Sequence, residues 1–220
     1  MIEARDLRRH YTMGTETIRA LDGVSLSIAA GDSVAILGPS GSGKSTLMHV
    51  LGGLESPTSG EIAVDGQDLA RLGAEALARY RNEKVGFVFQ SFNLQSHLTA
   101  IENVELPLKL GSVPRAGRRA LAEARLAEVG LLERKDHRPS ELSGGQRQRV
   151  SIARALVRSP RFLLADEPTG NLDSRTGAEI LELFLRLNRE KGLTLLVVTH
   201  NPELAQQLKR QVVLRDGKLA

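Results

Sequence analysis

Hydrophobic positions along the chain fall into short runs with two kinds of spacing. Residues 2–5 and 24–28 alternate apolar and polar side chains, which is typical of half-buried antiparallel strands. Continuous apolar runs occur elsewhere, and they predict buried strands. These runs lie within residues 33–37, 85–89, 162–167 and 194–198. Two more strands are predicted next to the turns at Asp65-Gly66 and Asp216-Gly217, where each would form a hairpin.

Between the strands, helix-forming segments are predicted. Residues 174–191 carry an apolar stripe at helical spacing, and Gly192 is placed to end that helix. Helix-forming residues dominate from 101 to 110 and from 115 to 129, and Gly130 suits the end of the second helix. We expect this stretch to form an inserted helical lobe.

These elements predict one α/β domain over residues 1–220. The β-rich core is expected to comprise residues 1–90 and 150–220, and the helical subdomain about residues 91–149. A chain of 220 residues suits a single compact domain, and 41% hydrophobic residues are enough for a large core. Aromatic residues make up only 3%, so the core is expected to be aliphatic.

The composition excludes several kinds of chemistry. The chain has no Cys, which removes disulfides, thiolate metal sites and a thiol nucleophile. The N-terminal residues carry charges where a signal peptide needs an apolar core, and no apolar run approaches the ~20 residues of a membrane span. We therefore expect a soluble chain whose role at a membrane depends on a partner.

The net charge of +4 is concentrated in one region. Between residues 111 and 160, 11 Lys and Arg stand against 5 Asp and Glu. A basic segment attracts nucleic acid, anionic lipid or nucleotide. No aromatic residues are interleaved with the basic ones, so a stacking surface for single strands is not expected. A solvated helix face explains most of these charges, and no nucleic-acid partner is expected.

The strongest motif is a phosphate-binding loop that follows the predicted strand at 33–37. It has the pattern G-x-x-x-x-G-K-[ST] and continues into a helix-compatible run. The loop and the start of the run comprise Gly38, Pro39, Ser40, Gly41, Ser42, Gly43, Lys44, Ser45 and Thr46. The glycines let backbone N–H groups face phosphate oxygens, Lys44 would reach the β- and γ-phosphates, and Ser45 would bind Mg²⁺. An ordinary Gly-rich turn is the alternative, and the position between a strand and a helix disfavours it.

Polar residues follow three of the predicted buried strands. They are Gln90, the pair Asp166-Glu167, and His200. Ligands bind at the carboxyl ends of strands in parallel α/β sheets, so we expect these side chains near the phosphate loop. Asp166 fits a Mg²⁺ ligand, together with Ser45 and Gln90, and Gln90 is also expected to be a catalytic residue. Strand alternation would turn Glu167 elsewhere, where it could polarise the attacking water. An N-cap pair of carboxylates and a structural His are the alternatives.

Two further features admit two interpretations each. Ser143-Gly144-Gly145-Gln146 precedes a helix-forming run and predicts a second helix N-terminus that can bind an anion, although a simple Ser143 N-cap is the alternative. Tyr11 is one of two tyrosines, and it could pack structurally or offer a flat surface to adenine.

Taken together, these motifs resemble the nucleotide-binding subunits of ABC transporters over essentially the whole chain. The resemblance rests on the phosphate loop, a glutamine loop at Gln90, and the signature at residues 142–146. It also includes the strand end at Asp166 and Glu167, an aspartate loop at residues 171–173, and a switch at His200. The resemblance implies a P-loop NTPase core of the RecA-like type, with an antiparallel β subdomain and an inserted α-helical subdomain.

The resemblance also implies roles for the residues. ATP and Mg²⁺ would be the ligands, and Tyr11 would stack on adenine. The subunits would form a head-to-tail homodimer with two ATP molecules between the phosphate loop of one chain and the signature of the other. Glu167 would be the general base, and His200 would contact the γ-phosphate. Residues that contact the shared nucleotide from the second subunit would be Ser143, Gly144, Gly145, Gln146 and Asp173.

A narrower resemblance concerns the membrane partner. Residues 51–54, 79–82, 86–90 and 98–104 look like the branch that serves macrolide exporters, lipoprotein-release complexes (LolD-like) and the cell-division ATPase (FtsE-like). In that branch the partner is an FtsX/MacB-like integral-membrane permease. The resemblance implies a peripheral subunit at the cytoplasmic face of the cell (inner) membrane, working in export, lipoprotein release or mechanotransmission.

Two other functions compete with this interpretation. One is a soluble ABC-type ATPase that acts on nucleic acid or ribosomes, but such relatives usually have a coiled-coil insertion, zinc-binding cysteines or a second cassette. None of these occurs in the sequence. The other is a regulatory nucleotide-binding module without turnover, which the presence of Glu167 and His200 argues against.

Overall fold

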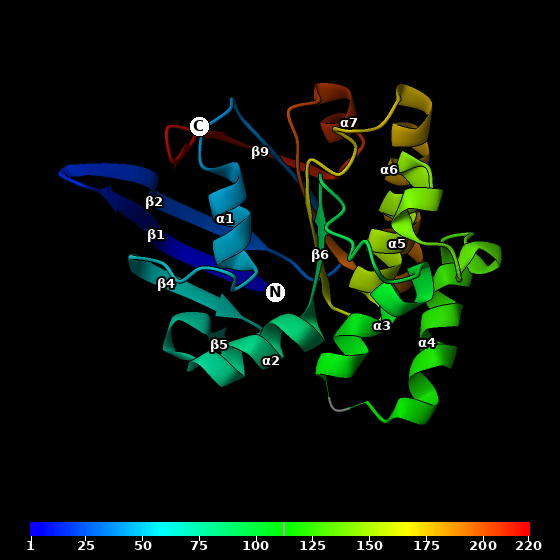
Figure 1. Cartoon of the computed structure of the whole chain (residues 1–220). Helices are drawn as coiled ribbons and strands as arrows, with labels where there is room; N and C mark the ends of the chain where they lie inside the picture. The colour runs from blue at the N-terminus through cyan, green and yellow to red at the C-terminus, as the bar shows by residue number, and fades with distance from the viewer. Residues whose placement is uncertain (112) are drawn as a thin grey trace.

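The computed structural model describes residues 1–111 and 113–220, in which two β-sheets and seven α-helices are arranged around the central strands (Figure 1). The first sheet is antiparallel, with the order β2-β1-β4-β5. Its strands are β1 (Ile2–Met13), β2 (Glu16–Ile28), β4 (Ser59–Val64) and β5 (Gln67–Asp68). The second sheet has the order β10-β9-β3-β8-β7-β6. Its strands are β3 (Ser33–Leu37), β6 (Val85–Phe89), β7 (Phe162–Asp166), β8 (Thr194–Val198), β9 (Arg210–Arg215) and β10 (Lys218–Leu219).

The second sheet is parallel except at one edge. β3 pairs in parallel with β8 and β9, β7 pairs in parallel with β6 and β8, and only β10 runs antiparallel to its neighbour. Fully buried strands of this kind consist of nearly continuous apolar residues, which is why the sequence predicted all four central strands correctly. The fold class expected from the sequence is thereby confirmed.

The helices lie on the two faces of the parallel sheet. They are α1 (Lys44–Leu51), α2 (Ala74–Lys84), α3 (Ala100–Leu110), α4 (Arg115–Glu128), α5 (Gly144–Leu156), α6 (Ser174–Lys191) and α7 (Pro202–Gln206). Three short 3₁₀ turns occupy Leu69–Arg71, Leu132–Arg134 and Pro139–Glu141. Among the helices of the described residues, none combines the length and the apolar character needed to cross a bilayer.

Alternation along the strands divides the core into two halves. Phe162 and Leu164 face a core shared with α1 and the antiparallel sheet, whereas Leu163 and Ala165 face a core shared with α3, α4, α5 and α6. The helical region is thus packed on the same face of the sheet as α6. The predicted subdomain boundary at residues 149–150 falls inside α5, and the division of the chain into subdomains stays a prediction.

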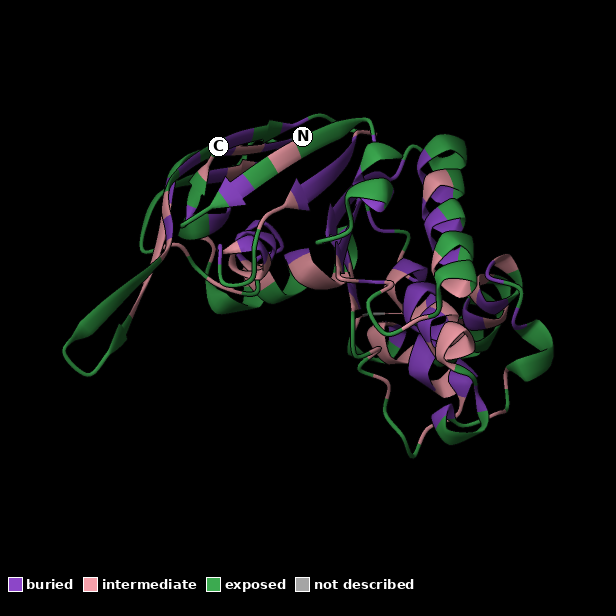
Figure 2. Ribbon diagram, turned by 90° about the horizontal axis from the view of Figure 1, so that it is seen from above, coloured by how far each residue is buried: buried purple, intermediate pink, exposed green. Residues whose placement is uncertain are grey.

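Local signals set most of the helix ends. Thr99 caps α3 in a reciprocal capping box with Glu102, and Gly192 ends α6 with a φ of 63°. The N-terminal strands differ from the prediction, because β1 and β2 extend well beyond residues 2–5 and 24–28. Their pairing continues to Met13 opposite Glu16, and Figure 2 shows the exposed tip of this hairpin projecting from the molecule. Cross-strand hydrogen bonds extend the hairpin to positions where both of its faces are exposed.

Candidate nucleotide-binding site

The parallel register brings the predicted site residues to one edge of the sheet. Phe89 lies opposite Asp166, and Asp166 lies opposite Val198. Ile36 of β3 also pairs with Val198. The residues that follow these strands therefore emerge at the same edge, as the sequence predicted: the phosphate loop after β3, Gln90 after β6, Glu167 after β7 and His200 after β8.

The phosphate loop requires glycine at two positions. A Cβ atom on Gly38 would lie less than 3 Å from the carbonyl oxygen of Leu214, and one on Gly43 would lie equally close to that of Ala20. The φ angles of 154° and 99° are also unfavourable for other residues. The loop is thus held against the backbone of β9 and β2, which leaves no room for side chains at these points.

Lys44 is buried at the start of α1, and its ammonium group lies over the loop. Nζ donates hydrogen bonds to the carbonyl oxygens of Gly38 at 2.9 Å and Pro39 at 2.8 Å. The hydroxyl of Ser42 is buried without a partner among the described residues. No side chain caps the N-terminus of α1. A cation, a spare hydroxyl and an uncapped helix start together suit a phosphate chain.

Asp166 and Ser45 fit a magnesium ion. The Asp166 Oδ1 atom is buried without a hydrogen-bond partner among the described residues. Burial raises the pKa of the Asp166 carboxyl and the Glu167 carboxylate acts in the same direction, whereas the Ser45 hydroxyl and Lys44 oppose the shift. No group of three or more His, Cys, Asp or Glu side chains is placed to hold a metal in the described chain. A carboxylate and a hydroxyl completed by substrate phosphates is the mode that Mg²⁺ prefers.

Gln90 lies at the same edge, but its amide group contacts a different loop. Nε2 donates to Oδ1 of Asn171 at 3.3 Å, and Nδ2 of Asn171 donates to the Gln90 carbonyl at 3.0 Å. The predicted role of Gln90 as a Mg²⁺ ligand therefore stays a prediction. The contact links the glutamine loop to the aspartate loop.

Glu167 and His200 form a pair beyond the strand ends. His200 Nδ1 lies 2.8 Å from Glu167 Oε2. Strand alternation was the wrong reason for the direction of Glu167, because β7 ends at Asp166 and Glu167 has a φ of 46°. Its N–H donates to the Val198 carbonyl and its carbonyl accepts from Gly170 N–H. A left-handed turn that is held at both ends thus aims the carboxylate.

The signature segment forms a capped helix start away from the phosphate loop. The Ser143 hydroxyl accepts from Gln146 N–H at 3.2 Å, and the Gln146 side-chain oxygen accepts from Ser143 N–H at 3.0 Å. Ser143 is therefore the N-cap of α5, and it is exposed while Gly144 and Gly145 are half-buried. α5 packs on one face of the parallel sheet and α1 on the other (Figure 1). The starts of α1 and α5 consequently lie on opposite faces of the sheet.

Asp173 serves as the N-cap of α6. Its carboxylate accepts from Thr176 N–H at 3.0 Å and from the Thr176 hydroxyl at 2.7 Å. These hydrogen bonds, led by that of the Thr176 side chain, lower the pKa of Asp173. The aspartate loop is thus fixed next to the signature, where Gly145 contacts Thr176 closely.

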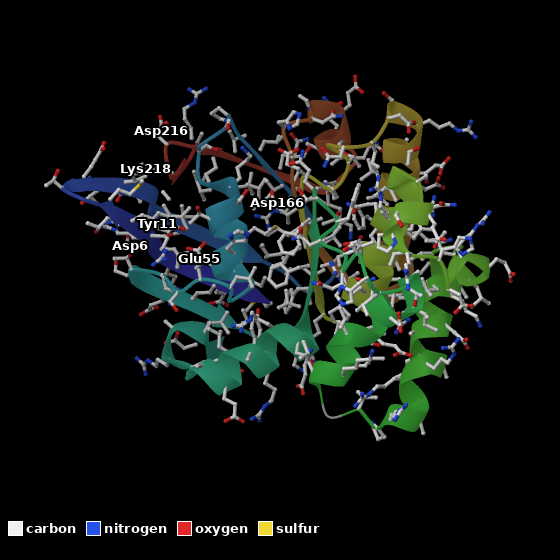
Figure 3. All side chains as sticks on the ribbon, in the orientation of Figure 1. Asp6, Tyr11, Glu55, Asp166, Asp216 and Lys218 are labelled. Atoms are coloured by element: carbon white, nitrogen blue, oxygen red, sulfur yellow. The ribbon has the colours of Figure 1, made fainter. Side chains whose placement is uncertain are left out.

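Tyr11 is half-buried on β1, and its hydroxyl donates to the Glu55 carboxylate at 2.5 Å (Figure 3). Glu55 is a residue that sequence reasoning missed, because nothing near it in the chain marks it. Gln148 was missed as well. It is fully buried on α5 and donates to the carbonyl of Pro168 at 2.6 Å, which supports the turn after Glu167. A polar residue on the apolar face of a helix was the available signal for Gln148.

Comparisons with known proteins agree with this geometry. The profile of the ABC transporter family matches residues 21–170. The lipoprotein-releasing system ATP-binding protein LolD of Geobacter metallireducens is 49% identical over 219 residues, which cover 100% of this chain and 97% of that protein. The macrolide export ATP-binding/permease protein MacB of Syntrophobacter fumaroxidans is 51% identical over 99% of this chain, which spans only 31% of MacB.

A solved structure extends the comparison to three dimensions. It is the dimeric post-hydrolysis state of the ATP-binding cassette MJ0796 bound to ADP and Pi. The two chains superpose with a TM-score of 0.92 at 45% sequence identity, covering 100% of this chain and 96% of the other. The fold, the motif order and these likenesses lead to one conclusion: the chain belongs to the ABC transporter family, as an ATP-binding ATPase subunit.

Proposed function

We propose that the protein hydrolyses ATP as a head-to-tail homodimer and transmits the resulting motion to an FtsX/MacB-like membrane permease. One observation carries the proposal. The groups for ATP chemistry meet at one edge of the parallel sheet, next to the start of α1, while α5, which begins at the signature, packs on the face of the sheet opposite α1. A single chain therefore cannot offer both helix starts to the same nucleotide. Two chains arranged head to tail can do so, which makes hydrolysis dependent on dimerisation.

The phosphate loop supplies binding and charge stabilisation in this scheme. The backbone N–H groups of residues 38–46 and the N-terminus of α1 would surround the phosphates. Lys44 would exchange its two carbonyl partners for phosphate oxygens, which bear negative charge and are stronger acceptors. Ser45 and Asp166 would hold Mg²⁺, with Gln90 close by. When bound, the ion neutralises charge on the phosphate oxygens.

Glu167 is proposed as the general base. Its carboxylate would accept a proton from the water that attacks the γ-phosphate. In the structure described here that carboxylate is paired with His200, so the pair must separate or turn when nucleotide enters. His200 is exposed, with 72% of its side-chain surface accessible, and could then move to the γ-phosphate. The pair thus connects the proposed base, Glu167, to the exposed His200 side chain that follows β8.

The second subunit would complete the site. Ser143, Gly144, Gly145 and Gln146 begin α5 and would contact the γ-phosphate of the nucleotide on the other chain. Asp173 lies in the adjacent loop and would contact the same nucleotide. Closure of the dimer on ATP and its opening after hydrolysis would provide the movement that is transmitted to the permease.

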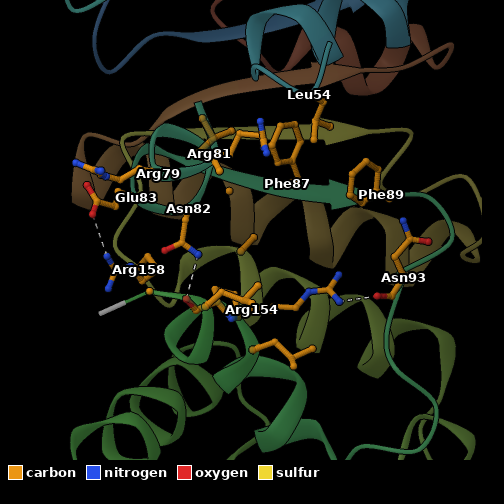
Figure 4. A pocket seen from close by; sticks show the side chains of 18 of the residues that line it. Leu54, Arg79, Arg81, Asn82, Glu83, Phe87, Phe89, Asn93, Arg154 and Arg158 are labelled. Atoms are coloured by element: carbon orange, nitrogen blue, oxygen red, sulfur yellow. Dashed lines mark hydrogen bonds and ion pairs between the residues drawn. The ribbon is translucent and has the colours of Figure 1, made fainter. Parts of the chain in front are cut away.

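A groove between β6, α2, α3 and α5 is proposed to receive the permease (Figure 4). Its volume is about 800 Å³, and the stacked rings of Phe87 and Phe89 lie in it with centroids 5.8 Å apart. Arg154 also lines the groove and donates only to the carbonyls of Phe92 and Asn93 among the described residues. An apolar floor beside an uncompensated cation suits an amphipathic cytoplasmic segment with a carboxylate. The chain would then lie peripherally at the cytoplasmic face of the cell membrane.

The substitution Glu167→Gln tests the hydrolysis scheme. It preserves size and removes the base, so turnover should fall by about 10²–10⁴-fold while ATP affinity is retained. Dimers stable in ATP should appear in light scattering. Glu203→Gln, which changes an exposed carboxylate on α7, is the matched control and should behave like the parent. Parental turnover in Glu167→Gln would refute the assignment of the base.

Co-purification from membranes with a tagged chain tests the proposed partner. We expect recovery of a permease with few membrane-spanning helices and a large extracytoplasmic domain. Arg154→Ala should reduce that recovery without affecting ATP binding. Recovery of a many-helix channel-like permease, or of ribosomes and nucleic acid alone, would contradict the proposed partner.

A further inference from the structure

The carboxylate of Glu55 is the meeting point of three donors that the hydrolysis scheme does not use. The Tyr11 hydroxyl reaches Oε2 at 2.5 Å and Arg9 Nε reaches the same atom at 3.1 Å. His49 Nδ1 lies 3.3 Å from Oε1. Burial alone would raise the pKa of Glu55, but the hydrogen bonds from Tyr11, Arg9 and His49 lower it overall. The side chain therefore remains an anionic acceptor.

This cluster joins the antiparallel sheet to the helix that begins at the phosphate loop. Arg9 and Tyr11 are two residues apart on β1 and so lie on the same face of the strand. His49 belongs to the last turn of α1, and Glu55 N–H donates to its carbonyl. Figure 3 places Tyr11 and Glu55 side by side next to α1. Glu55 thus ties the tyrosine to the far end of the helix whose near end holds the phosphates.

The Tyr11 ring is held on its face as well as at its hydroxyl. The guanidinium carbon of Arg9 lies 4.6 Å from the ring centroid. A cation over one face is favourable for an electron-rich ring and restricts its rotation. A purine would then stack on the opposite face, with the ring already oriented.

We propose that Glu55 is a positioning residue for the nucleotide base: it fixes the Tyr11 ring at a set distance from the phosphate loop, so that adenine and triphosphate are bound together. The proposal rests on the proposed function, since it assumes ATP at the phosphate loop. A side chain that is ordered before binding loses less conformational entropy when the ligand arrives. Glu55 should therefore raise the affinity for ligands that carry a base, and it should not change the affinity for phosphate ligands that lack one.

Calorimetric titration of the purified full chain tests this, with Mg²⁺-ATP and inorganic tripolyphosphate as the two probes. In Glu55→Ala the affinity for ATP should fall about tenfold, equivalent to about 1.4 kcal/mol. The affinity for tripolyphosphate should be unchanged, because it lacks a base. KM for ATP should rise by a similar factor while kcat is retained. Glu61→Ala, an exposed carboxylate on β4, is the control and should match the parent for both probes.

A double-substitution cycle shows whether Glu55 acts through the tyrosine hydroxyl. Tyr11→Phe should weaken ATP binding as well, and combining it with Glu55→Ala should cost no more than Glu55→Ala alone. An equal loss of affinity for ATP and tripolyphosphate, or fully additive effects, would overturn the inference. A parent chain that bound neither probe would instead refute the proposed function.

Discussion

The contact between the starts of α5 and α6 allows a quantitative prediction for Gly145→Ala. Gly145 has an ordinary helical backbone, so alanine is conformationally acceptable there. The restriction is steric, because an added Cβ would lie less than 3 Å from Cγ2 of Thr176. Thr176 cannot withdraw freely, since its N–H and its hydroxyl both donate to Asp173. The substitution must therefore strain the N-terminus of α6.

The size of the effect follows from three contributions. Overpacking of this kind costs about 1–3 kcal/mol, and weakening the Asp173 cap adds about 1 kcal/mol. The higher helix propensity of alanine returns at most about 1 kcal/mol. We expect Gly145→Ala to lower the free energy of unfolding by about 2 kcal/mol, as measured by urea denaturation followed by circular dichroism.

Thr176→Ser supplies the decisive comparison. It removes the Cγ2 methyl group but keeps the hydroxyl that donates to Asp173. In that background Gly145→Ala should change the free energy of unfolding by less than about 0.5 kcal/mol, because the steric conflict is gone. Gly144→Ala is a milder control, since the nearest atom to its Cβ would be Leu172 Cδ2, at 3.3 Å. An undiminished loss in the Thr176→Ser background would refute the reasoning.

Three further predictions concern the phosphate loop, the shared site and a helix cap. Lys44→Ala should weaken ATP binding in equilibrium dialysis by about 10–100-fold, as expected for lost charged hydrogen bonds, and unchanged affinity would contradict the role of the loop. Ser143→Arg should place bulk at the shared γ-phosphate, so ATP-dependent dimers should disappear from light scattering and turnover should fall to background; normal dimers would rule out the shared site. The backbone N–H of Thr99, followed by its hydroxyl, lowers the pKa of the Glu102 carboxyl. The ionised Glu102 carboxylate should therefore stabilise the chain fully above its ordinary pKa of 4.5, and this stabilisation should decrease as the pH falls below that value. Glu102→Ala should accordingly destabilise the chain at neutral pH, and the loss in the free energy of unfolding should become smaller as the pH is lowered.

Several parts of the structure were predictable because the responsible interactions are local. The central strands at residues 33–37 and 194–198 must be apolar on both faces, which leaves a continuous pattern in the sequence. The phosphate loop is recognisable because its glycines, Lys44 and Ser45 lie close together in the sequence, within residues 38–45. The cap at Ser143 joins residues three apart, so a few neighbouring positions sufficed to predict that helix start.

Other features depend on residues far apart in the chain, and only the tertiary structure decided them. The length of the N-terminal hairpin comes from pairing between β1 and β2, and not from the alternation of either strand. Glu167 is aimed by a left-handed turn whose N–H is bonded to Val198, over 30 residues away in the chain. The Tyr11–Glu55 contact joins residues 44 positions apart. Sequence pattern thus determined where the candidate phosphate loop lies, whereas long-range packing determined how Glu167, Tyr11 and α5 are oriented, because no local interaction sets those directions.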